Sequence, residues 1–150
     1  MDYPNFQGIV HFKAASRADN WGDASKISRS LLLELDKLRN LVGSPIFVTS
    51  GYREKPLFGI THSQHMQGRA VDIVCPSKPL NILLTVAETL AFTGIGAYPD
   101  WSWNGKKCGG LHLDVRETKR RAQWMGITDP IHGEVYIALD EINKKHYGVI

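Results

Sequence analysis

Residues 63–73 read SQHMQGRAVDI, and their second half begins an apolar run that only Asp72 interrupts. A continuous apolar run of this kind is typical of a buried strand. A buried carboxylate without a partner is costly, so Asp72 needs a cation or a hydrogen-bond donor nearby. His65 lies seven residues earlier, and Gly68 between them permits a sharp approach of the loop to the strand. Asp72 therefore either shares a metal ion with His65 or pairs with Arg53, and this segment alone leaves both interpretations open.

A second segment, residues 111–116 (LHLDVR), adds a further candidate ligand. Its polar and apolar residues alternate, so we expect a strand with His112 and Asp114 on one face. Two histidines and one carboxylate from separate elements are a common set of protein ligands for a catalytic zinc ion, with the fourth position left for water or substrate. His65, Asp72 and His112 are therefore candidate ligands of one Zn²⁺ ion per chain.

The rest of the chain shows both helical and strand-like patterns. Apolar residues after Asp23, a candidate N-cap, fall on one stripe of a helix that Gly43 ends. The predicted strands cover residues 46–50, 70–75, 95–98 and 111–116, two later helices cover residues 79–92 and 134–145, and residues 51–68 and 99–110 are predicted loops. We predict an α+β fold in one domain spanning residues 1–150, with a small, mainly antiparallel sheet flanked by helices.

Composition and charge argue against several classes of protein. Of the 150 residues, 43% are hydrophobic and 22% are charged, as expected of a globular protein with a core. The net charge of +3 is mildly basic, and the densest basic run, residues 119–121, is interpreted as a solvated turn, so we expect no nucleic-acid partner. No apolar stretch approaches the ~20 residues that span a bilayer. Cys75 and Cys108 form no CxxC pair and are expected to be free thiols.

Three motifs together resemble one known family. They are TSGYR at residues 49–53, the SxHxxGxAxDI pattern at residues 63–73 and HxDxR at residues 112–116. In this order they resemble the zinc D-alanyl-D-alanine carboxypeptidase family, which shares its fold with the hedgehog signalling domain and includes many phage endolysins. The resemblance covers roughly residues 24–124. It implies a hedgehog/DD-peptidase-like fold and a zinc peptidase that hydrolyses peptidoglycan stem peptides or cross-bridges. We expect the chain to be a monomer.

The resemblance also implies roles for individual residues. His65, Asp72 and His112 match the zinc ligands of the family. Arg53 matches the arginine that contacts the substrate carbonyl or carboxylate, and Ser63 matches a serine that lines the same pocket. For Arg53 the alternative is a structural salt bridge with Asp72 or Glu54. Three aromatic residues border the loop before His112 and either line a substrate groove or pack, namely Tyr98, Trp101 and Trp103.

One position departs from the family pattern. Better-known members place a Glu or Asp three residues before the last histidine ligand as general base, and here that residue is Gly109. Asp114 is the first alternative candidate for the base, because strand alternation puts it on the face of His112. It is equally a candidate for orienting a ligand histidine through a hydrogen bond. The weaker candidates for the base are Glu117, Asp100 and His62.

Gly109 also leaves a second function open, a non-catalytic zinc-bearing binding module or phage structural module of the same fold. The first residues lack the basic and apolar regions of a secretory signal, so we expect synthesis in the cytoplasm. Action on the cell wall would then require release by another agent, as for a phage or prophage endolysin.

Overall fold

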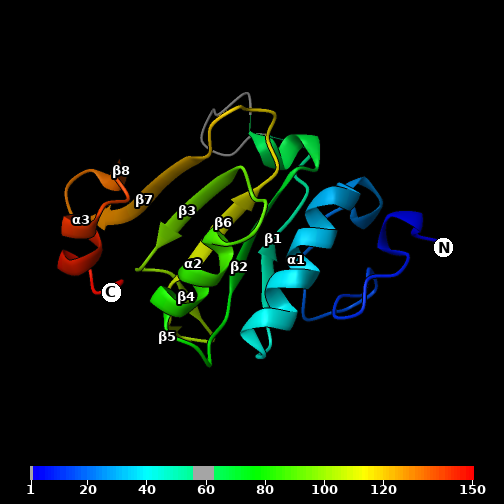
Figure 1. The fold of residues 1–150 in the computed structure, drawn as a ribbon, viewed down its shortest axis with the longest axis horizontal. Coiled ribbons are helices and arrows are strands. Elements are labelled where there is room, and N and C mark those ends of the chain that lie inside the picture. Colours follow the sequence, from blue (N-terminus) through cyan, green and yellow to red (C-terminus); the bar gives the residue numbers. More distant parts are fainter. Residues whose placement is uncertain (1, 56–62) are drawn as a thin grey trace.

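The computed structural model describes residues 2–55 and 63–150 (Figure 1). Among these residues, one six-stranded sheet has the order β1-β2-β6-β3-β7-β8. Neighbouring strands are antiparallel except for β3 and β7, which are parallel. The strands are β1 (Phe47–Ser50), β2 (Ala70–Val74), β3 (Gly94–Tyr98), β6 (Gly110–Asp114), β7 (Ala122–Asp129) and β8 (Gly133–Ile137), and a separate hairpin pairs β4 (Ser102–Trp103) with β5 (Lys106–Lys107).

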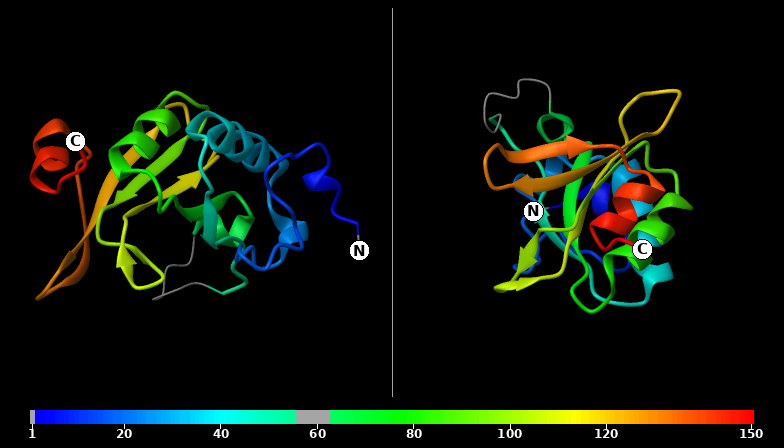
Figure 2. Two further views of the ribbon diagram at one scale, coloured as in Figure 1. Left: turned by 90° about the horizontal axis from the view of Figure 1, so that it is seen from below. Right: turned by 90° about the vertical axis from the view of Figure 1, so that its left-hand side faces the viewer.

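The helices confirm the predicted α+β class. In the described part of the chain the α-helices are α1 (Arg29–Val42), α2 (Leu80–Glu88) and α3 (Glu141–His146), and short 3₁₀ turns occur at η1 (Pro4–Phe6), η2 (Ala24–Lys26) and η3 (Gln64–Gln67). Helices α1 and α2 lie side by side over one face of the sheet, and none of the described α-helices covers the other face (Figure 2). None of the described helices is long and apolar enough to cross a bilayer.

The alternation of side chains along the strands separates the two faces of the sheet. The residues that point toward α1 and α2 are apolar and fully buried, and they include Val71, Ile73, Ile95, Leu111, Leu113 and Met125. On the opposite face, which we call the open face, Asp72 pairs with His112, and Gly96 pairs with both His112 and Trp124. The two candidate ligands carried by strands therefore lie next to each other on the open face.

Helix α1 begins later than the sequence predicted. Asp23 does act as a cap, but for the 3₁₀ turn η2, where its side chain accepts a hydrogen bond from the backbone N–H of Ser25. The chain then turns, because the N–H of Ser28 donates to the carbonyl of Gly68 at 2.7 Å. Gly43 ends the helix as predicted, with φ of 70° in the left-handed region.

The C-terminal part differs most from the prediction. The helix predicted over residues 134–145 is wrong, because β8 occupies its first part and only α3 is helical. Gly133, with φ of 75°, closes the hairpin that joins β8 to β7, a strand that the sequence did not predict. Asp140 then caps α3 by accepting from the N–H of Asn143 at 2.8 Å.

The loop predicted over residues 99–110 also contains regular structure. Strands β4 and β5 pair across Asn104 and Gly105, both with positive φ, which is the backbone conformation of a tight hairpin turn. Cys75 is buried and Cys108 is partly exposed just after this hairpin, and both are free thiols as expected.

Candidate metal centre

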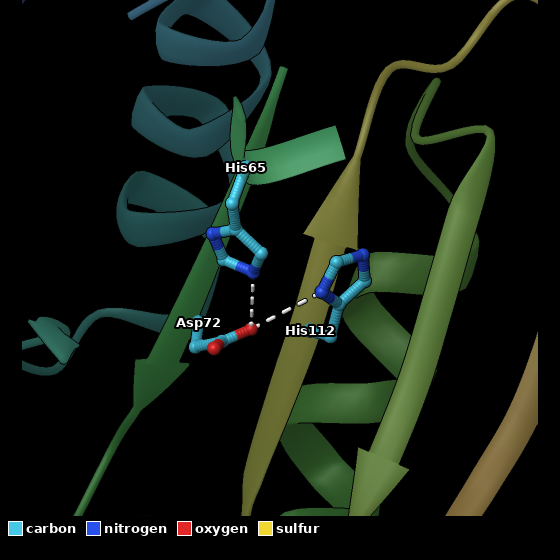
Figure 3. Close-up of side chains that lie close together, drawn as sticks. All are labelled: His65, Asp72 and His112. Atoms are coloured by element: carbon cyan, nitrogen blue, oxygen red, sulfur yellow. Dashed lines mark hydrogen bonds and ion pairs between the residues drawn. The ribbon is translucent and has the colours of Figure 1, made fainter. Parts of the chain in front are cut away.

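His65, Asp72 and His112 converge on the open face (Figure 3). They come from η3, β2 and β6, and one ligand atom from each lies within 4.8 Å of the others. Asp72 Oδ1 lies 3.2 Å from His65 Nε2 and 3.1 Å from His112 Nδ1. The structure therefore brings together the three residues that the sequence proposed as ligands, in a group that could hold a metal ion.

The turn η3 orients His65 through local contacts. Ser63 caps the turn by accepting a hydrogen bond from the N–H of His65 at 3.2 Å, and Gly68 ends it with φ of 70°. A side chain at Gly68 would collide with the carbonyl oxygen of Lys26, 1.8 Å from an added Cβ. His65 Nδ1 lies 2.8 Å from the carbonyl oxygen of Gly51. Because a carbonyl only accepts, Nδ1 carries the proton and Nε2 faces Asp72.

His112 is oriented by a buried ion pair behind it. Its Nε2 lies 2.7 Å from Asp114 Oδ2, and Asp114 is 0% exposed. Arg116 holds the same carboxylate through Nε at 2.9 Å and Nη2 at 2.6 Å. Burial works to raise the pKa of Asp114, but hydrogen bonds from His112 and Arg116 outweigh it and hold this pKa well below its ordinary value. The carboxylate accepts the Nε2 proton, so Nδ1 of His112 faces Asp72.

The position of the Asp114 carboxylate also requires the glycine on the neighbouring strand. Gly94 pairs with Asp114 across β3 and β6. An added Cβ at Gly94 would lie 2.2 Å from both carboxylate oxygens. A side chain at this position would displace the carboxylate from His112.

Arg53 lies beside the same group. Its Nη2 donates to Asp72 Oδ2 at 3.1 Å and its Nε donates to Ser50 Oγ at 3.0 Å. The Arg53 side chain remains 24% exposed, so part of the guanidinium is accessible from the open face. The permanent charge of the Arg53 guanidinium next to Asp72 Oδ2 favours the ionised form of this carboxyl. The sequence analysis offered a salt bridge with Asp72 or Glu54 as the alternative role of Arg53, and the structure contains the salt bridge with Asp72.

The donor set fits a divalent metal ion. The hydrogen bonds to Gly51 and Asp114 leave the lone pairs of His65 Nε2 and His112 Nδ1 directed at an ionised carboxylate oxygen of Asp72. Lone pairs and a negative charge repel one another at these distances, and either a metal ion among them or an added imidazole proton removes the repulsion. Two nitrogens and one oxygen are also a ligand set that zinc prefers.

Aromatic rings cover the open face next to the group. The Trp124 ring lies 5.2 Å from that of His112, and Trp124 Nε1 donates to Tyr98 Oη at 2.9 Å. Tyr98 is buried and stacks on Trp101 at 4.2 Å. An added Cβ at Gly96 would lie 2.5 Å from the Trp124 ring, and one at Gly126 would lie 2.1 Å from the Tyr98 ring. The sequence interpretation gave Trp124 no role, although glycines on adjacent strands leave room for such a ring.

The remaining candidates for a general base lie away from the ligands or outside the described residues. Glu117 is 86% exposed and pairs with Arg69 at 3.4 Å. Asp100 pairs with Lys107 at 2.9 Å. Gly109 has φ of 71°, and an added Cβ would lie 2.8 Å from the Leu80 side chain, so the local packing suits glycine. His62 lies outside the described residues.

Comparison with known proteins identifies one family. A family model described as Peptidase M15 matches residues 7–103, well over half of the chain. His65 and Asp72 lie inside the match, whereas His112 and the β7–β8 hairpin lie beyond its end. No curated protein matches the chain.

Proposed function

Because this chain belongs to the Peptidase M15 family, we propose that it is a zinc-dependent peptidase that hydrolyses amide bonds in peptidoglycan stem peptides or cross-bridges. The observation that carries the proposal is the convergence of two imidazole nitrogens and one carboxylate oxygen within 4.8 Å on the open face. The peptidoglycan substrate rests on the motifs at residues 49–53, 63–73 and 112–116, which resemble those of wall carboxypeptidases and endolysins.

We assign one zinc ion per chain to His65 Nε2, Asp72 Oδ1 and His112 Nδ1. A zinc ion held there would polarise the scissile carbonyl and lower the pKa of a bound water towards ~7. Within the protein, Gly51 and Asp114 hold the outer ring nitrogens of the two histidines, so each imidazole keeps the orientation that binding requires.

Arg53 is the proposed electrophilic residue. Its guanidinium is always charged and lies next to Asp72, where it would stabilise negative charge on the scissile carbonyl oxygen or hold a substrate carboxylate. Ser50 fixes the plane of the guanidinium by accepting from Nε. Ser63 and Tyr98 are proposed to line the substrate pocket, in addition to capping η3 and supporting Trp124.

Asp114 is proposed to orient His112 rather than to act as general base. The carboxylate is fully buried, bonded to His112 and held by two nitrogens of Arg116. A general base works best with a pKa near the operating pH, whereas the pKa of Asp114 is held far below it. The sequence left open whether Asp114 is the general base or orients His112, and these contacts favour the orienting role.

The proposed domain, residues 1–150 acting as a monomer, would reach the wall after release from the cytoplasm. The test is digestion of purified peptidoglycan with added zinc, followed by mass spectrometry of the released fragments. We expect new peptide termini from one type of amide bond, and none with His112→Ala. Zinc binding without release of any fragment would favour the second function, a non-catalytic zinc-bearing module, which the glycine at position 109 supports.

A further inference from the structure

Strand β8 forms the edge of the sheet on the far side of the metal group from Arg53. The strand order places β1, which precedes Arg53, at one edge and β8 at the other, with β2 and β6 between them. The β7–β8 hairpin extends away from α1 and α2, toward the side of the open face (Figure 2, left view). Side chains of β8 that point to this side therefore border the open face.

The register identifies these side chains as Tyr136 and Glu134. Tyr136 pairs with Gly126 and Glu134 pairs with Thr128. Gly126 and Thr128 alternate with Met125, so they share the face of Trp124, and directly paired residues of antiparallel strands share a face. Tyr136 Oη donates to Glu134 Oε1 at 2.9 Å, as expected of two side chains on one face.

Tyr98 links this pair to the metal group. Its ring lies over Gly126, the cross-strand partner of Tyr136, and its hydroxyl accepts from Trp124 beside His112. Glu134 is bonded to Tyr136 on that same face, so the two residues of β8 lie on the face of the sheet that carries Tyr98, Trp124 and His112.

Glu134 presents a negative charge with no cation bound to it in the part of the chain that the structure describes. One of the two lysines of the β4–β5 hairpin, Lys107, is paired with Asp100, which also accepts from the N–H of Thr128. Tyr136 beside Glu134 is 59% exposed. A carboxylate next to an accessible aromatic ring suits a primary ammonium group, which gains an ion pair and a cation–π contact.

We propose that Glu134 and Tyr136 bind a primary ammonium group of the substrate peptide. The inference rests on the proposed function, because it sets the orientation of a peptide at that site, with carboxylate toward Arg53 and amine toward β8. Both residues lie beyond residues 7–103, which the family model matches, so they would add a specificity contact to those of the matched region.

The test uses one synthetic stem peptide, L-Ala-γ-D-Glu-L-Lys-D-Ala-D-Ala, in four forms. The peptide has two amines, the α-amine of L-Ala and the ε-amine of L-Lys. In the four forms both amines are free, only the α-amine is acetylated, only the ε-amine is acetylated, or both are acetylated. KM and kcat are measured for each form, and calorimetry measures binding to the zinc-loaded protein. The wild type should bind at least one free-amine form about tenfold more tightly than the doubly acetylated form. The two singly acetylated forms show which amine is recognised.

The variant Glu134→Gln should remove this preference by raising KM for the recognised peptide about tenfold. Its kcat, its zinc content and its KM for the doubly acetylated peptide should equal those of the wild type. Glu141→Gln is the matched control, because Glu141 is an exposed carboxylate on α3 that pairs with Lys144. It should behave as the wild type.

Two results would overturn the inference. The first is equal affinity of the wild type for all four forms, and the second is an equal change in KM for all four forms in Glu134→Gln. Failure of the proposed function gives a different result, no hydrolysis of any form. Calorimetry then still decides the inference, since a preference for the free amine that Glu134→Gln abolishes would support it without turnover.

Discussion

The two faces of the sheet are built from the same strands and differ in almost every physical respect. On the face under α1 and α2, Ile73, Leu111 and Leu113 are fully buried, and apolar burial of this kind contributes roughly 25 cal/mol per Å². On the open face, Asp72 and Asp114 are buried charges, which cost free energy unless they are fully paired. Apolar packing is therefore concentrated on the face under α1 and α2, and the group that could hold a metal ion lies on the open face. A slip of one residue in register would exchange them.

Leu113→Ala should give the largest effect and tests the helix-covered face. Leu113 lies between His112 and Asp114 in sequence but points into the core. Its truncation should cost about 2–5 kcal/mol of unfolding free energy, measured by urea denaturation. The zinc affinity of the folded fraction should stay within about threefold of the wild type, because the Leu113 side chain points to the face opposite His112. A large loss of zinc affinity with little loss of stability would break the division between the faces.

Arg53→Lys tests the exposed end of the open face. Lysine keeps the charge but loses the planar fork that contacts both Ser50 and Asp72. We expect kcat/KM to fall by about 10²–10³-fold, close to the loss in Arg53→Ala, with zinc content unchanged. If Arg53→Ala instead unfolds the protein, the ion pair with Asp72 is structural.

Asp114→Asn and Gly94→Ala test the ion pair behind His112 in two independent ways. The first removes the charge, and the second keeps it but pushes the carboxylate away from the ring. Both should lower zinc affinity about 10–100-fold in a chelator competition assay, and added zinc should restore most of the activity. A loss of turnover of about 10²–10⁴-fold at saturating zinc in Asp114→Asn alone would instead identify Asp114 as the base.

Glu117→Gln should have the smallest effect. The side chain is exposed and its contact with Arg69 is a surface ion pair. The variant's kcat/KM and its equilibrium constant of unfolding should therefore change by less than about twofold. Asp100→Asn provides a second comparison away from the ligands. A tenfold or greater loss of kcat in either variant would identify the substituted residue as the general base.

The sequence predicted that His65, Asp72 and His112 lie together, because the signals for this are local. The cost of burying Asp72, the glycine at position 68 and the alternation around His112 each depend on a few neighbouring residues. Strands β1, β2, β3 and β6 were predicted within one or two residues for the same reason.

The errors arose where long-range contacts decide the structure. Residues 134–139 have apolar spacing compatible with a helix, but pairing with β7 makes residues 133–137 a strand. Helix α1 starts late because Ser28 bonds to Gly68, 40 residues away. The place of Trp124 depends on the space above Gly96 on a neighbouring strand, and the burial of Asp114 depends on Gly94. No local pattern carries this information.

The central claim is that His65, Asp72 and His112 hold one zinc ion, and an anomalous difference map at the zinc edge tests it most directly. Crystals grown with equimolar zinc should show one strong peak on the open face. It should lie about 2.0–2.2 Å from His65 Nε2, Asp72 Oδ1 and His112 Nδ1. A map with no peak among these three atoms, or with its main peak elsewhere on the protein, would contradict the claim.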